Sequence, residues 1–379
     1  MPSPDRVTRD AHPGAWWLWA LALATAASRT TNPLLLGLIL AVASFVVVRR
    51  RGDAPWARGF RYYLALAVVV VMIRVLFRVL LGGGVGSHVV FTLPSLQLPA
   101  AAAGITLGGR VTAEAVLAAA YDGLRLATML VCLGAANALA NPKRLLKLLP
   151  GALYEVGVAV VVALSVAPQL IESVLRVRRA RRLRGGATKG RRALAGIFLP
   201  VLEDALDRSL RLAAAMDSRG YGRRAGVARG ERVGTGVLVV TGLLGVCIGL
   251  YGLLGSDAGS RHLGVVAFLG GGTLAIAGLL VGGRSVRRTR YRPDVWAGAE
   301  WMIAGCGVVA AAVMLGLSPS QLYPTLFPLQ WPQLPLVAAA AIMVAALPGW
   351  LAPAPAVRRQ ASPRRTPAVV APSRKRVDA

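Results

Sequence analysis

Long uncharged runs alternate with short, strongly basic segments along this chain of 379 residues. Several of the apolar runs are about 18–27 residues long, and about 20 apolar residues are enough to cross the hydrocarbon core of a bilayer. The pattern therefore predicts an all-α polytopic membrane protein with about eight transmembrane helices. These spans cover 16–48 as two short helices, 62–81, 114–140, 234–254, 263–283, 299–317 and 334–351.

Three segments between or within these spans depart from the simple pattern of one long apolar run per helix. The run 16–48 is broken at Asn32-Pro33, because a proline disfavours helical geometry at the residue before it. The segment 82–111 is rich in glycine and nearly uncharged, and we expect a long loop there. The run 153–167 is apolar but short for a span.

The charges orient the spans. The chain has 44 basic and 16 acidic residues, a formal net charge of +28. Of the basic residues, 36 lie in blocks that the positive-inside rule assigns to the cytoplasm, namely 49–61, 141–150, 169–232, 284–298 and 352–379. Because 141–150 and 169–232 are both cytoplasmic, the run 153–167 is not expected to cross the membrane once. If the 16–48 hairpin crosses twice, both termini are inside.

These features divide the chain into four predicted regions. Residues 1–150 form an N-terminal transmembrane region, and 151–232 a coupling-helix region at the cytoplasmic face. Residues 233–351 form a C-terminal transmembrane region. The tail 352–379 is rich in Pro, Ala and Arg, so we expect it to be disordered, with basic residues that reinforce topology or touch anionic lipid.

The cytoplasmic segment 169–232 contains two similar halves. Each is predicted to be an amphipathic helix that begins at a proline, Pro168 or Pro200, and ends at an Arg-Gly pair. The first half carries Glu172 close to its start; in the second half the acids are expected at the positive end of the helix dipole, and these are Glu203, Asp204 and Asp207.

The two helix ends have the same sequence pattern. Each has an alanine one turn before the arginine and a glycine after it, giving Ala180, Arg184 and Gly185, and then Ala215, Arg219 and Gly220. The glycines fit a left-handed cap that stops the helix. The other arginines of the first half are interpreted as membrane-surface anchors. The repeated end is interpreted as a docking group for another protein, since arginine offers a planar fork of donors.

On these residues the chain resembles the transmembrane T component of energy-coupling factor transporters, the EcfT or CbiQ-like family, over residues 12–225. The context also matches, in Pro168 followed by Glu172 and in Asn141-Pro142 with the segment that follows. The early Asn32-Pro33 is a further, weaker match. The resemblance implies a non-enzymatic subunit of the plasma membrane, with ATP hydrolysis in partner subunits. Those partners are two cytoplasmic ATP-binding subunits, expected to dock on the two Arg-Gly ends, and a substrate-binding membrane S component for uptake of a vitamin or transition-metal ion. The family usually has about one span after the coupling region, whereas four are predicted here.

Two features inside the predicted spans carry further hypotheses. Arg74 and Asp122 lie at similar depth in neighbouring spans, which predicts an intramembrane ion pair. The alternative is that the basic side chains of this span only reach for the membrane surface, with Arg78 snorkelling to the outer interface. Gly245 and Gly249 form a G-x-x-x-G pattern, which we interpret as packing within the chain.

Other function classes have weaker support. The chain has no zinc-ligand spacing, no P-loop order of residues and no expected cofactor or metal site. A membrane-embedded enzyme needs acids or other reactive groups that converge at one membrane face, whereas the acids in or near the spans are scattered. A self-contained secondary transporter is marked by an inverted membrane repeat, and the sequence shows none. These two classes remain the alternatives. A nucleic-acid partner is not expected, because the basic residues follow the topology.

Overall fold

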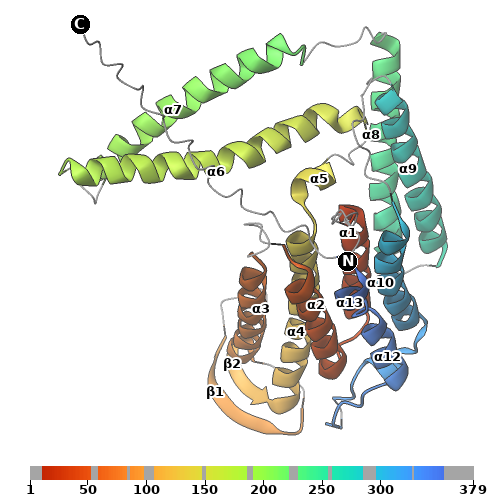
Figure 1. Cartoon of the computed structure of the whole chain (residues 1–379). Helices are drawn as coiled ribbons and strands as arrows, with labels where there is room; N and C mark the ends of the chain where they lie inside the picture. The colour runs from red at the N-terminus through yellow and green to blue at the C-terminus, as the bar shows by residue number, and fades with distance from the viewer. Residues whose placement is uncertain are drawn as a thin grey trace, which may run out of the picture. The chain divides into compact units, whose positions relative to one another are not determined.

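The computed structural model describes residues 11–52, 59–82, 86–97, 106–146, 151–185, 191–221, 229–254, 258–284, 296–326 and 328–353. The chain forms two compact units, one of Met1–Asn141 with Asp294–Ala379 and the other of Pro142–Pro293. Both units are built mainly from helices (Figure 1), so the all-α prediction is confirmed. The predicted disordered tail lies, from residue 354 onward, outside the described residues.

The first unit combines both ends of the chain. Its N-terminal elements are α1 (Pro13–Ser28), α2 (Pro33–Arg50), α3 (Phe60–Leu81), β1 (Val89–Gln97), β2 (Thr106–Thr112) and α4 (Ala113–Leu139). Its C-terminal elements are α10 (Gly298–Gly316), α11 (Pro319–Leu322), α12 (Leu336–Val344) and α13 (Pro348–Leu351). The predicted region 233–351 is therefore shared between the two units.

The break between α1 and α2 is the one predicted at Asn32-Pro33. The side chain of Asn32 accepts a 3.0 Å hydrogen bond from the backbone N–H of Leu34, as an N-cap does, and Pro33 occupies the first turn of α2. Arg125 of α4 donates to the carbonyl of Ser28, which is one of the free carbonyls at the end of α1.

The core of this unit is formed by the two ends of the chain packing on each other. Trp19 of α1 is fully buried and its indole N–H donates a 3.0 Å hydrogen bond to the carbonyl of Ala345. Gly307 of α10 lies directly against the backbone of Trp19, where a Cβ would be 2.7 Å from its Cα. The C-terminal helices thus complete the bundle that α1, α2 and α4 begin.

The start of α1 lies beside the start of α10. The backbone N–H of His12 donates a 3.2 Å hydrogen bond to the buried carboxylate of Glu300, and the His12 ring lies 4.9 Å from the ring of Trp296. Both helices therefore begin at the same face of the bundle. The basic segment 284–298 precedes α10, so the positive-inside rule assigns this face, and the start of α1, to the cytoplasm.

Two predicted segments differ from the structure. The expected loop 82–111 contains an antiparallel hairpin of β1 and β2, because Val89, Val90 and Thr92 favour extended backbone. The predicted span 334–351 is divided into α12 and α13 by a turn before Pro348, since proline cannot donate the backbone hydrogen bond that would continue α12.

Seven helical segments are long and apolar enough to cross a membrane, judged by length and composition among the described residues. They are α2, α3, α4, η3 with α6, α8, α9 and α10. The helix α1 has 16 residues and the apolar segment Leu336–Leu351 is also shorter. The chain is therefore a multi-pass membrane protein, as predicted.

The second unit contains α5 (Pro142–Leu146), the short 3₁₀ helix η3 (Gly151–Leu153), α6 (Tyr154–Leu183), α7 (Arg191–Ser218), α8 (Arg229–Leu254) and α9 (Ala258–Arg284). The helices α8 and α9 form an antiparallel hairpin with glycines along the contact. A Cβ on Gly245 would lie 2.9 Å from the Cα of Gly271, and Gly249 lies against Phe268. Gly245 and Gly249 therefore pack within the chain, as the sequence predicted.

Candidate coupling-helix site

The helix α6 includes both the apolar run 153–167 and the basic stretch that follows Pro168. Pro168 lies inside this helix of 30 residues, so the prediction that it begins a helix is wrong. A proline inside a helix removes one backbone hydrogen bond, to the carbonyl four residues earlier. The helical segment before Pro168 is apolar, and the segment after it is rich in arginine. The helix continues through the proline. The apolar run 153–167 and the first half of the basic segment 169–232 therefore form one continuous helix.

The helix α7 corrects a second prediction in the same way. It begins at Arg191, and Pro200 lies inside it. Glu203, Asp204 and Asp207 are therefore in the middle of a helix of 28 residues and not at the positive end of its dipole. The groups that stabilise these acids are therefore side chains, because the dipole effect is confined to the first and last turns.

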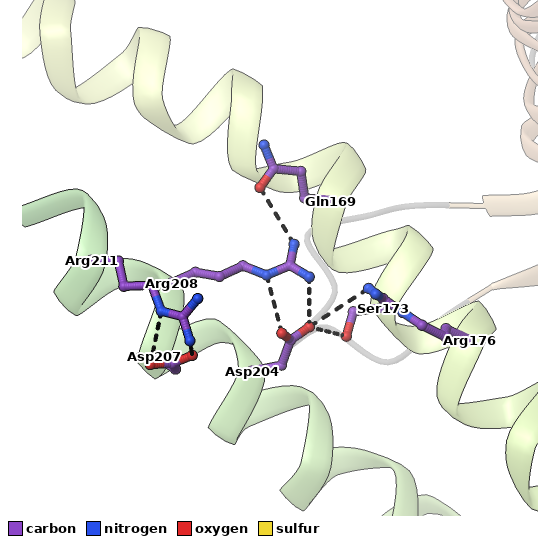
Figure 2. Close-up of polar contacts among 7 residues, drawn as sticks. All are labelled: Gln169, Ser173, Arg176, Asp204, Asp207, Arg208 and Arg211. Carbon is purple, nitrogen blue, oxygen red and sulfur yellow. Dashed lines mark hydrogen bonds and ion pairs between the residues drawn. The ribbon is translucent and has the colours of Figure 1, made fainter. Parts of the chain in front are cut away.

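Asp204 is the centre of the contact between α6 and α7 (Figure 2). Its carboxylate accepts a 2.6 Å hydrogen bond from the hydroxyl of Ser173 and bonds of 3.1 and 2.9 Å from the guanidinium of Arg208. Arg176 of α6 lies 3.8 Å away. The hydrogen bond from Ser173, with further help from the charges of Arg208 and Arg176, holds the pKa of Asp204 below its usual range.

The contacts between the two helices run in opposite order, so α6 and α7 are antiparallel. Arg208 also reaches Gln169 at 3.5 Å, and the side chain of Arg181 lies against Gly196. Low residue numbers on α6 therefore meet high numbers on α7. Asp207 differs from Asp204, because its 2.6 Å ion pair is with Arg211 of its own helix.

Both helices end as the sequence predicted. Gly185 and Gly220 have φ of 68° and 75°, in the left-handed region that favours glycine. At the end of α7 the N–H of Gly220 donates to the carbonyl of Asp217 at 2.8 Å, and that of Tyr221 to the carbonyl of Met216 at 3.0 Å. This pair of bonds is a Schellman motif, which fixes where the helix stops.

The two Arg-Gly ends present their arginines to the surroundings. Ala180, Ala215, Arg184 and Arg219 are all exposed. Among the residues that the structure describes, neither guanidinium has an ion-pair or hydrogen-bond partner, in contrast to Arg176, Arg208 and Arg211. Each is therefore free to bind a carbonyl or carboxylate group of another protein.

The structure does not bring Arg184 and Arg219 together. Arg184 follows α6 at the end next to the start of α7, and Arg219 follows the far end of α7 (Figure 1). With 28 residues in α7, the two ends are about 40 Å apart along the helix. A single small binding site could not contact both arginines.

The predicted intramembrane pair is at ion-pair distance. Arg74 Nη2 of α3 lies 3.8 Å from Asp122 Oδ2 of α4, and about half of each side chain is exposed. The two helices are close here because Gly123 faces the Cα of Val71, where a Cβ would be 3.1 Å away. The importance of the pair for assembly stays a prediction.

One polar cluster was missed in the sequence. Glu114 is 1% exposed, and a single oxygen of its carboxylate accepts bonds from the hydroxyl and N–H of Ser87 and the N–H of His88. The His88 ring lies 2.8 Å from the same oxygen. The cluster joins the start of α4 to the β1–β2 hairpin. Glu114 is more than 25 residues from Ser87 and His88, so spacing carried no signal.

Within the described ranges, no group of three or more His, Cys, Asp or Glu residues is placed to hold a metal ion. Cys132 and Cys306 are buried singly, and no disulfide joins the three cysteines.

Comparison with known proteins gives one family. The profile of the CbiQ family, described as "Cobalt transport protein", matches residues 4–227 of this chain. The match covers more than half of the chain and includes α1 to α7, whereas α8 to α13 lie beyond it. No curated protein matches the sequence.

Proposed function

The chain belongs to the CbiQ family of cobalt transport proteins, and we propose that it is the transmembrane coupling subunit of an energy-coupling factor transporter. In this proposal the chain is not itself an enzyme, and two cytoplasmic ATP-binding subunits bind to it and hydrolyse ATP. Their motion passes through α6 and α7 to a substrate-binding membrane subunit, which releases a vitamin or a transition-metal ion inward.

The observation that carries the proposal is the repeated helix end. Two exposed arginines, Arg184 and Arg219, each follow a helix that a left-handed glycine stops, and about 40 Å of helix separates them. The cap fixes the backbone position of each arginine, which favours docking of its side chain into a preformed groove. Two equivalent groups at opposite ends of one helix pair fit two partner subunits better than one.

The antiparallel contact supports the mechanical part of the proposal. Ser173, Arg176 and Arg208 converge on Asp204, so a force on either Arg-Gly end is passed to the other helix through a polar contact. The arginines that make this contact differ from the two that are proposed to dock.

The test is co-purification from membranes. The tagged chain is co-expressed with the two ATP-binding subunits of its transporter, and Arg184→Glu, Arg219→Glu and the double variant are compared with the parent. We expect each single change to weaken retention of the ATP-binding subunits and the double change to abolish it. Arg179→Glu is the matched control, since Arg179 is an exposed arginine of α6 that is not at a helix end.

The proposal fails if the parent retains no ATP-binding subunit, or if the double variant retains as much as the parent. Insertion must be unchanged in all variants, which is checked by their yield in the membrane fraction and by a single symmetric peak in size-exclusion chromatography.

A further inference from the structure

The connector between α3 and α4 carries almost no charge. Between residues 82 and 109 there is no Asp, Glu, Lys or Arg, and Arg110 is the first charged residue after α3. The basic blocks 49–61 and 141–150 are assigned to the cytoplasm, so this connector lies on the opposite, outer side of the membrane. Protein surfaces in water normally expose charged side chains. The composition of the connector therefore favours an environment other than bulk water.

The hairpin of β1 and β2 is fixed to the start of α4. Val89 pairs with Thr112, the residue that precedes α4, and the N–H of Ala113 donates a 2.8 Å hydrogen bond to the carbonyl of His88. The buried carboxylate of Glu114 accepts a further 3.1 Å hydrogen bond from the N–H of His88. This end of the strand ladder is therefore at the level of the first turn of α4.

The same hairpin reaches the end of α3 four residues further along β1. Leu93 pairs with Gly109, and the carbonyl of the neighbouring Gly108 lies directly against Gly82, the residue that follows α3. Gly82 and Gly108 have φ of 56° and 84°, so glycine permits this close approach of the two backbones. The segment 89–93 thus runs from the start of α4 to the end of α3, and the hairpin lies at these helix ends in Figure 1.

These two helix ends are at similar depth in the membrane. Arg74 and Asp122, which lie 3.8 Å apart, are seven residues from Leu81 and nine residues from Ala113, respectively. The difference of two residues corresponds to about 3 Å along the helices. The segment 89–93 therefore lies across the outer surface of the membrane and does not project away from it.

Apolar side chains of this segment are exposed in more than one direction. Val89, Val90 and Phe91 are consecutive, and they are 38%, 60% and 42% exposed. Successive residues of a strand point to opposite faces, so these three do not all share one face, even with the register shift between Val89 and Phe91. A protein docked on one face would leave part of this surface in water, whereas a surrounding apolar medium covers all of it.

The strand edges restrict how deep the hairpin can lie. In the part of the chain that the structure describes, this sheet has two strands, so each strand has one edge without a neighbour. Open sheet edges do not occur in the hydrocarbon core, because their N–H and C=O groups need hydrogen-bond partners. The boundary between acyl chains and headgroups meets both needs, since it is apolar on one side and hydrated on the other.

The other outer connectors of the chain agree with this placement. The connector 317–335 of the first unit also has no charged residue, and its Trp331 is 94% exposed; tryptophan is enriched at membrane interfaces. The outer connector of the second unit, 255–262, is short and carries Asp257, Arg261 and His262. It offers no apolar surface of the kind that would cover the hairpin.

We propose that the β1–β2 hairpin binds the outer leaflet of the bilayer, at the boundary between acyl chains and phospholipid headgroups. Val90 and Phe91 insert among the first acyl carbons, and the exposed side chain of Arg110 reaches the lipid phosphates. The hairpin thereby holds the outer ends of α3 and α4 at one depth. This inference goes beyond the function proposed above and requires no other subunit.

The test measures the depth of spin labels. Val90→Cys and Phe91→Cys are made in a full-length chain whose three native cysteines are replaced by alanine, labelled, and reconstituted into vesicles of phosphatidylcholine and phosphatidylglycerol. Power saturation compares collisions with oxygen, which concentrates in lipid, and with the water-soluble nickel complex NiEDDA. We expect oxygen to dominate at both positions. Leu76→Cys is the reference within the span: Leu76 is 53% exposed and six residues before Gly82, so its label should lie about 9 Å deeper.

Two results overturn the proposal. Frequent collisions with NiEDDA at both positions would place the hairpin in water. Few collisions with either reagent would show that protein covers it, either the second unit or another copy of the chain. A label at Phe91 as deep as the one at Leu76 would also contradict an interfacial position.

A charge reversal tests the contact with phosphate. Arg110→Glu replaces a cation by an anion at an exposed strand position, and Arg110→Lys keeps the positive charge as the matched control. We expect Arg110→Glu to move the label at Phe91 towards water, with more NiEDDA collisions, and Arg110→Lys to leave it as in the parent. If both variants keep the parent's depth, Arg110 does not bind the lipid phosphates.

Discussion

The hydroxyl of Ser173 in α6 donates a 2.6 Å hydrogen bond to the carboxylate of Asp204 in the middle of α7, 31 residues further along the chain. The same carboxylate holds Arg208 of its own helix and Arg176 of the other. The contact is small, and it lies between two helices whose remaining surfaces are largely exposed. The relative position of α6 and α7 therefore depends strongly on one side chain.

Replacing Asp204 with alanine should loosen the helix pair. The change removes the acceptor of Ser173 and the ion-pair partner of both arginines, and it leaves Arg176 and Arg208 facing each other without a negative charge. Spin labels at the exposed positions Arg179 and Leu199 report the separation of the helices, and we expect a broader distance distribution in Asp204→Ala. Asp207→Ala is the control, because Asp207 pairs only within α7, with Arg211. Equal distributions in both variants would contradict the assigned role of Asp204.

The same contact should depend on pH in a defined direction. The pKa of Asp204 is lowered in the folded chain, first by the hydrogen bond from Ser173 and then by Arg208 and Arg176. The pKa of an aspartate in an unfolded chain is about 3.9. The stabilisation is therefore complete above about pH 4 and is lost as the pH falls through the lower folded-state pKa. The label distances should be constant from neutral pH down to about pH 4 and broaden below it.

The control for this pH dependence is Asp204→Asn. The amide does not titrate, so its distance distribution should be independent of pH over the same acidic range. A parent and an Asp204→Asn variant that broaden together would show that another group titrates.

Gly220 should be required for docking although it carries no side chain. Its φ of 75° costs an L-residue about 1–2 kcal/mol, so Gly220→Ala should fray the last turn and displace Arg219. We expect the affinity for the ATP-binding subunit to fall between about fivefold and thirtyfold. Gly220→Asn should bind better than Gly220→Ala, because asparagine tolerates the left-handed region. The measurement is a titration of the purified chain in nanodiscs.

The matched control is Gly230→Ala in α8. Gly230 has no heavy atom within 4 Å of an added Cβ and its φ is not left-handed, so this change should leave binding unchanged. If Gly230→Ala and Gly220→Ala weaken binding equally, the left-handed cap does not account for the effect.

Helix positions could be predicted wherever a local signal marks an end. The break at Asn32-Pro33 and the bounds of α3, α4 and α10 agree with the sequence within two residues, because apolar runs there end at proline, glycine or charge. The caps at Gly185 and Gly220 were predictable for the same reason. Pro168 and Pro200 misled the prediction, since a proline also fits inside a helix when the turns on both sides favour it.

Interactions between residues that are distant in the sequence could not be predicted from such local signals. Asp204 looked like an N-terminal acid of a helix, and only the antiparallel packing of α6 and α7 shows that its partners include Ser173 and Arg176. The contact between Arg74 and Asp122 is a partial exception, because the depth of each residue in the membrane can be estimated from the sequence. Two charges in neighbouring spans at equal depth form a short list of candidate pairs, whereas Glu114 and His88 had no such restriction.

The α8–α9 hairpin should distinguish two adjacent glycines. A Cβ on Gly271 would lie 2.5 Å from the backbone N of Val246 and 2.6 Å from the carbonyl carbon of Gly245, whereas one on Gly270 meets no heavy atom within 4 Å. Gly271→Val must therefore push α9 away from α8, and overpacking of this kind typically costs about 1–3 kcal/mol. Gly270→Val adds the same volume, at the same depth in the bilayer, to the surface that faces lipid. We expect thermal unfolding in detergent to begin at a lower temperature in Gly271→Val alone. Equal destabilisation by the two changes would mean that the effect comes from valine in the helix and not from the contact with α8.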